Sequence, residues 1–117
     1  MYLVIAFLCR LDKVNELIIK MREKGFMGGT WIDGVGMGRV MTKAFDVPLI
    51  ASLRSIFDEA TELNKILFCV VENETNMTEL LNLIGEVMGD LSKPDTGLVI
   101  SMQLEQVMGF THWRTPK

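Results

Sequence analysis

The sequence predicts an α+β fold in which one βαβ unit occurs twice, and three observations support this prediction. Residues 3–8 (LVIAFL) and 66–71 (ILFCVV) are continuous apolar runs, which are typical of strands in the middle of a sheet. Each run is followed by a stretch with apolar residues at helical spacing that ends at a glycine. A further strand-like segment then closes each copy, so the element order is βαβ twice.

In the first copy we expect a helix that Asp12 caps and that ends before Gly25. Its apolar stripe consists of Val14, Leu17, Ile18 and Met21. The closing strand of this copy is expected from Gly29 to about Gly38.

In the second copy Asn76 and Glu79 have the spacing of a capping box, and the helix is expected to reach Gly89. The stripe is repeated by Met77, Leu80, Leu81, Ile84 and Met88. The closing strand is expected from Gly97 to about Leu104.

Two βαβ units with right-handed crossovers form a four-stranded antiparallel sheet with both helices on one face, the ferredoxin-like arrangement. The strands are apolar on both faces, as in YLVIAFLC (residues 2–9), so the face without helices also requires cover. A second copy of the chain is the simplest cover, and we therefore expect a homo-oligomer.

Composition limits the class of protein. The 117 residues are expected to form a single domain, 1–117, and a net charge of −3 does not favour a nucleic-acid partner. The apolar start is too short to span a membrane and lacks the features of a signal peptide, which indicates a cytoplasmic protein. Cys9 and Cys69 both lie in apolar runs, so we expect buried free thiols.

Residues between the two copies contain an additional amphipathic pattern. Pro48 suits a first helical position, and apolar residues recur at helical spacing through residues 48–63. The predicted helix either packs on its own protomer or a neighbour in the oligomer, or docks on a partner protein.

The stretch TWIDGVGMGR (residues 30–39) places three glycines, Gly34, Gly36 and Gly38, two residues apart in a strand-like context. Glycine weakens a strand, so it requires a reason there. One explanation is a bulge and turn at a sheet edge. The other is a backbone that approaches a ligand's phosphates closely, with Arg39 supplying charge.

Together with the element order, this stretch and DTGLVISMQLEQVMGF (residues 95–110) resemble the PII family of trimeric signalling proteins, also called nitrogen regulatory proteins P-II. In that family a Gly-x-Gly-Arg opens a long effector loop, and adenine nucleotides bind in clefts between subunits. The resemblance implies a homotrimer that controls a protein partner, an enzyme or a transporter, with ATP, ADP or AMP as the ligand. It implies ligand-binding roles for Thr30, Gly36, Met37, Gly38, Arg39, Asp95, Thr96 and Gly97.

The sequence departs from the family at several charged positions. Leu98 replaces the lysine of the family's Gly-Asp-Gly-Lys loop, and Val40 replaces the glutamine that follows Gly-x-Gly-Arg. Gly109 and Thr111 stand where the family carries basic residues. Because charge-assisted phosphate contacts each contribute roughly 1.5 to 3 kcal/mol, these departures disfavour ATP binding of the usual kind.

An enzyme is not expected, since His112 is the only histidine and no nucleophile with a base is recognisable. No metal site is expected either, because one histidine and two cysteines make a poor divalent-metal site. Two alternatives to the PII-like sensor therefore stay open: a ligand-free protein-interaction module and a CutA-like trimer with the same fold. Trp31 is interpreted as a packing residue, with stacking on a base as the alternative.

Overall fold

The computed structural model describes residues 1–37, 64–93 and 96–109. Its elements follow the order β1 (Tyr2–Leu8), α1 (Leu11–Glu23), β2 (Thr30–Gly34), β3 (Asn64–Val71), α4 (Glu74–Met88) and β4 (Gly97–Gln103). The helix predicted within residues 48–63 lies outside the described residues.

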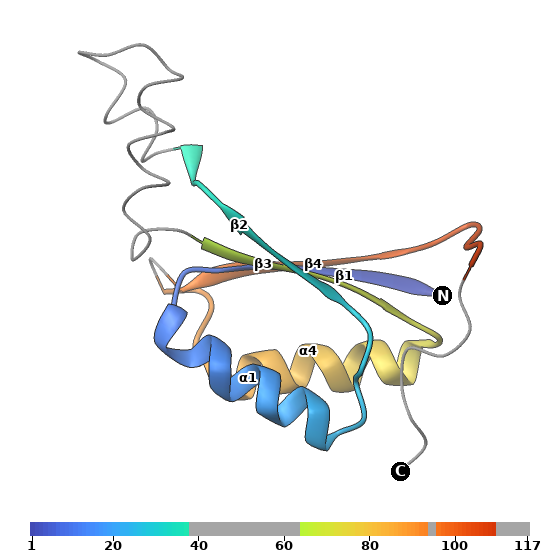
Figure 1. Ribbon diagram of the computed structural model, residues 1–117, viewed down its shortest axis with the longest axis horizontal. Helices are drawn as coiled ribbons and strands as arrows, with labels where there is room; N and C mark the ends of the chain where they lie inside the picture. The colour runs from blue at the N-terminus through green and yellow to red at the C-terminus, as the bar shows by residue number, and fades with distance from the viewer. Residues whose placement is uncertain (38–63, 94–95, 110–117) are drawn as a thin grey trace.

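The four strands form one antiparallel sheet in the order β2-β3-β1-β4. This is the order that two interleaved βαβ units produce, and α1 and α4 lie side by side on one face of the sheet (Figure 1). The predicted ferredoxin-like α+β fold is therefore confirmed for the described residues.

The core lies between the helices and one face of the sheet. Alternate residues of the two central strands are at most 3% exposed and form the covered face: Val4, Ala6, Leu8, Leu67, Cys69 and Val71. From the helices, Leu17, Leu80, Ile84 and Met88 are fully buried against them. This alternation places every second strand residue in the core, as the pleat of a strand requires.

The opposite face of the sheet, here called the open face, carries no described element (Figure 1). The strand register shows that its centre is apolar. By strand register it consists of Ile32, Ile66, Phe68, Val70, Leu3, Ile5, Phe7, Leu98, Ile100 and Met102. Exposed fractions reach 58% for Leu98, 47% for Met102 and 45% for Ile32. A contiguous apolar surface of this kind is the expected mark of an interface.

Both predicted helix caps are wrong by a few residues. Helix α1 begins after Arg10, whose side chain makes no capping hydrogen bond. Asp12 lies in the first turn, where its negative charge interacts favourably with the positive end of the helix dipole. Helix α4 begins after Asn73, whose side-chain oxygen accepts the backbone N–H of Asn76 at 2.8 Å. Asn73 is the N-cap instead of Asn76, because its extended backbone places that oxygen at the first turn.

Three further expectations need correction. Strand β2 ends at Gly34 rather than near Gly38, because its partner β3 begins at Asn64, directly opposite Gly34. Cys9 is exposed, since β1 ends one residue before it, whereas Cys69 is buried as expected. Ile18 is 41% exposed, because the core-facing stripe of α1 is narrower than its apolar residues indicate.

Candidate functional site

Both glycine elements of the predicted site lie at one end of the sheet, here called the glycine end. There β2 and β1 finish while β3 and β4 begin: Gly34 pairs with Asn64, and Leu8 pairs with both Lys65 and Gly97. The two elements sit on opposite edges, since β2 and β4 are the outermost strands. With about 4.8 Å between neighbouring strands, they are about 14 Å apart within one chain.

On the β2 edge only the first of the two described glycines lies in close contact with a neighbouring side chain. A Cβ on Gly34 would lie 2.6 Å from Cδ1 of Ile66, and one on Gly36 would lie 3.7 Å from Nδ2 of Asn64. Gly36 and Met37 are exposed, and the Met37 side chain is 76% exposed. Glycine at position 34 thus lets β2 pass close over Ile66, and the segment after it presents its backbone to solvent.

On the β4 edge Gly97 is held in a conformation that other residues rarely adopt. Its φ is +147°, and a Cβ there would lie 2.4 Å from the carbonyl oxygen of Phe7. Thr96 before it is 8% exposed and donates its hydroxyl to the carbonyl of Lys93 at 2.7 Å. The Cys9 N–H in turn donates to the carbonyl of Thr96 at 3.2 Å. The Thr96 hydroxyl proton is therefore already used in a hydrogen bond to the backbone of Lys93.

Thr30 belongs to the open face, because it pairs with Phe68, whose side chain is exposed there. Its neighbour Trp31 points to the other face and packs, half-buried, against the core. The packing interpretation of Trp31 is thereby supported. Thr30 lies four residues before Gly34 on β2, so it belongs to the same edge strand as the first glycine element.

Three of the predicted ligand-binding residues, Gly38, Arg39 and Asp95, lie outside the described residues. The same holds for the C-terminal segment 110–117, which contains His112. Of the eight predicted residues, the structure places Thr30, Gly36 and Met37 on the β2 side and Thr96 and Gly97 on the β4 side.

Sequence reasoning missed basic residues that the fold brings to the glycine end. Arg10 follows β1 by two positions, and Lys65 pairs with Leu8. Arg10 lies 3.7 Å from Asp12, and Lys65 forms an ion pair with Asp33 across the β2–β3 ladder. Their positions at the ends of predicted strands could have indicated this. Where one strand of an antiparallel pair finishes, its neighbour begins, so the residues at these two points lie at the same end of the sheet.

Asp90, at the start of the loop that leads to β4, has a turn role. It accepts the backbone N–H of Ser92 at 2.9 Å and the Ser92 hydroxyl at 2.6 Å. These two hydrogen bonds hold the pKa of Asp90 below its usual value. The carboxylate is thus a local acceptor that shapes the loop.

Cys69 lies on the covered face, and its Sγ contacts the carbonyl of Gly28 at 3.4 Å. Burial raises the pKa of this thiol from 9.0 to about 11, because the thiolate would lose its hydration. A thiol with a raised pKa is a poor nucleophile at neutral pH. Among the described residues no group of three or more His, Cys, Asp or Glu side chains could hold a metal ion.

Comparisons with known proteins support the fold. No protein-family model matches the chain, and no curated protein matches it. A crystal structure of a functionally unknown protein from Pediococcus pentosaceus ATCC 25745 is similar, with a TM-score of 0.59 and 15% identity. The similarity covers 93% of this chain and 96% of that chain, so it extends over almost the whole of both.

No helix among residues 1–37, 64–93 and 96–109 is both long and apolar enough to cross a membrane.

Proposed function

We propose that this chain is a PII-like regulatory protein: a homotrimer that senses a small ligand, in the first instance an adenine nucleotide, in clefts between its subunits and thereby controls a partner protein. The observation that carries the proposal is the position of the two glycine elements, at the same end but on opposite edges of a sheet whose open face is apolar.

The open face supports the oligomer. Ten apolar side chains from all four strands share it, and among the described residues nothing covers them. Burying apolar surface contributes about 25 cal/mol per Å², so copies that pack these faces together gain substantially. A cyclic arrangement closes on itself and leaves no copy with a free face.

The distance between the glycine elements supports a site between subunits. Because the two glycine elements are about 14 Å apart across one sheet, they cannot both contact the same phosphate group. In a ring of identical copies, however, the β2 edge of one copy can meet the β4 edge of the next. The exposed backbone at Gly36 and the cations Arg10 and Lys65 would then lie near a shared cleft.

Native mass spectrometry of the full chain tests the proposal, with ATP, ADP, AMP and cyclic nucleotides added in turn. We expect a trimer that takes up to three ligands, and Arg39→Ala should remove binding while leaving the trimer intact. Lys13→Ala is the matched control, because Lys13 lies on α1 and pairs with Glu16 at 3.8 Å. A monomer overturns the proposal, as does nucleotide uptake that is insensitive to Arg39→Ala.

One observation favours the second candidate, a ligand-free protein-interaction module. The Thr96 hydroxyl donates within its own loop, so the Thr96 side chain offers no proton to an anion. A trimer that stays empty with every nucleotide would select this candidate. The segment 48–63 would then be the first place to look for the partner's binding surface.

A further inference from the structure

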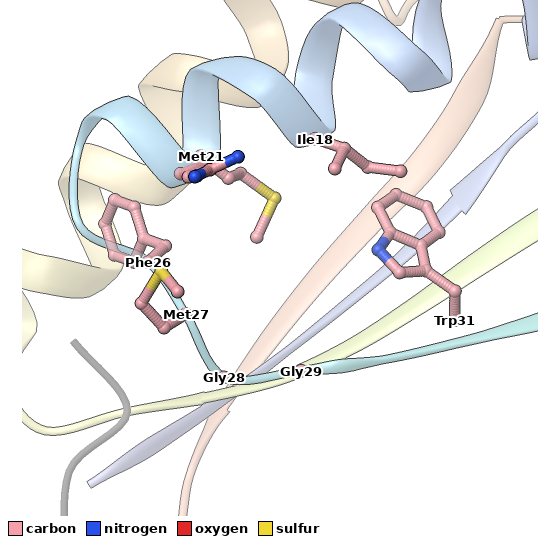
Figure 2. A pocket seen from close by; sticks show the side chains of 8 residues that line it. Ile18, Met21, Phe26, Met27, Gly28, Gly29 and Trp31 are labelled. Carbon is pink, nitrogen blue, oxygen red and sulfur yellow. The ribbon is translucent and has the colours of Figure 1, made fainter.

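A hollow lies on the helix side of the sheet, between α1 and the edge strand β2. Its volume is about 260 Å³, and its lining comes from α1, the connection after it and the start of β2. Figure 2 shows Ile18 and Met21 on α1 above, Trp31 rising from β2 towards Ile18, and Phe26 and Met27 closing one side. The hollow is therefore separate from the glycine end and from the open face.

The lining is soft and apolar. Two methionines, a phenylalanine, a tryptophan and an isoleucine surround the space, and methionine side chains adapt to ligands of irregular shape. Ile18 is 41% exposed and Met27 is 61% exposed, so the apolar wall is open to solvent. The backbone carbonyl of Gly28, which also lines the hollow, accepts a hydrogen bond from the buried Cys69 thiol at 3.4 Å.

One cation, Arg22, lines this hollow and has no carboxylate partner among the residues that the structure describes. The neighbouring Lys20, by contrast, lies 3.7 Å from Glu16 and 3.9 Å from Glu86. An arginine fork beside an apolar wall is suited to a carboxylate that carries an apolar body, because two parallel N–H groups match the two carboxylate oxygens.

The volume limits the size of that body. A dry apolar cavity of about 150 Å³ accommodates benzene, so a hollow of about 260 Å³ accommodates roughly ten non-hydrogen atoms. We propose that this hollow binds a small monocarboxylate with an aryl-alkyl or medium-chain body, whose carboxylate pairs with Arg22 while its body packs against Trp31 and Met27.

An extended peptide added to the outer edge of β2 is less consistent with these observations. Peptides that add a strand use a series of pockets for alternate side chains. Here a single hollow lies beside the strand, and the next residue on this face, Asp33, already pairs with Lys65. The proposed carboxylate site does not depend on the proposed nucleotide site, since the hollow lies beside the start of β2 whereas the glycine end is where β2 finishes.

The test is a titration of the full chain with 4-phenylbutyrate, followed by NMR of ¹³C-methyl-labelled methionines. We expect saturable shifts of the Met21 and Met27 methyl groups, with no shift of Met102, which lies on the open face. The matched amine, 4-phenylbutylamine, should not bind. Shifts of Met102 that track those of Met21 would mean adsorption to the open face and overturn the proposal.

Two variants separate the carboxylate contact from the apolar contact. Arg22→Gln should weaken 4-phenylbutyrate binding by about ten-fold or more, since a charge-assisted pair is lost. Lys13→Gln is the control, because Lys13 lies on the same helix, pairs with Glu16 at 3.8 Å and does not line the hollow. Ile18→Trp, at a half-exposed position, should fill the hollow and abolish the shifts while the circular dichroism spectrum stays native.

Three further outcomes overturn the inference: equal affinity for the amine and the carboxylate, an Arg22→Gln variant that binds as tightly as the wild type, and a hollow that binds a hydrophobic peptide but not 4-phenylbutyrate. Because none of these measurements involves nucleotides or the trimer, their failure is distinguishable from failure of the proposed function.

Discussion

The two faces of the sheet are built from the same kinds of residue but have opposite environments. On β3 the covered face holds Leu67 and Cys69, at 1% and 0% exposed, while Phe68 between them is 37% exposed. Both sets are apolar, so residue type does not distinguish the faces. The difference arises because α1 and α4 lie on one side only, and it teaches that the described residues leave half of this sheet's apolar surface without a cover.

The largest expected effect comes from placing a carboxylate on each face in turn. Leu67→Asp buries an unpaired charge and should destabilise the fold by more than about 4 kcal/mol, so that the chain no longer folds. Phe68→Asp, one residue away, should keep the native circular dichroism spectrum but prevent self-association in sedimentation experiments. If Phe68→Asp unfolds the chain as completely as Leu67→Asp, the two faces are not energetically different.

A second effect tests how closely the backbones pack at the glycine end. Gly97→Ala places a Cβ 2.4 Å from a carbonyl oxygen at a φ of +147° and should lower the free energy of unfolding by about 1 to 3 kcal/mol. The matched control is Gly85→Ala in α4, where a Cβ meets nothing within 4 Å. That change should raise stability by about 0.5 to 1 kcal/mol. Urea unfolding measures both changes in free energy. A Gly97→Ala variant as stable as the wild type would contradict the close approach of Gly97 to the Phe7 carbonyl.

A third test concerns the dryness of the covered face. Burial raises the pKa of the Cys69 thiol from the ordinary value of 9.0 to about 11. Between these pH values the unfolded chain has released its proton and the folded chain has not, so stability falls as pH rises. The loss should be on the order of 2 kcal/mol across that window.

The measurement is the difference in unfolding free energy between the wild type and Cys69→Ala from pH 8 to pH 11. This difference should change with pH, whereas the same comparison for Val71→Ala, a buried position on the covered face without an ionisable side chain, should be flat. A flat profile for Cys69→Ala would mean that water reaches the thiol. In that case the covered face would be less completely sealed than its exposed fractions indicate.

The smallest expected effect concerns the helix that seals the covered face. Asn73→Ala removes the acceptor for the Asn76 N–H and should cost about 1 kcal/mol. Thr75→Ala, an exposed position in the same first turn, should change stability by less than about 0.5 kcal/mol. Thermal unfolding measures the loss of stability in both variants. Equal losses would contradict the capping role of Asn73.

The sequence predicted part of the candidate site because some of its signals are local. Glycine at 97 requires a special backbone, and glycine at 34 permits a close approach over Ile66. The basic residues Arg10 and Lys65 were missed, since their proximity to Gly97 depends on strand register. The hollow beside Arg22 was missed as well, because it is formed by a helix, a connection and a strand that come together only when folded.

By itself, the sequence determined the order of elements and most of the helical residues that are buried. Apolar runs predicted the central strands, and helical periodicity predicted the inward sides of both helices apart from Ile18, because local geometry dictates which side chains share a surface. The tertiary structure decided which sheet face is covered, which cysteine is exposed and which residue caps each helix. The physical reason is that β1 is apolar on both sides, so its period-two alternation carries no information about which side the helices will cover.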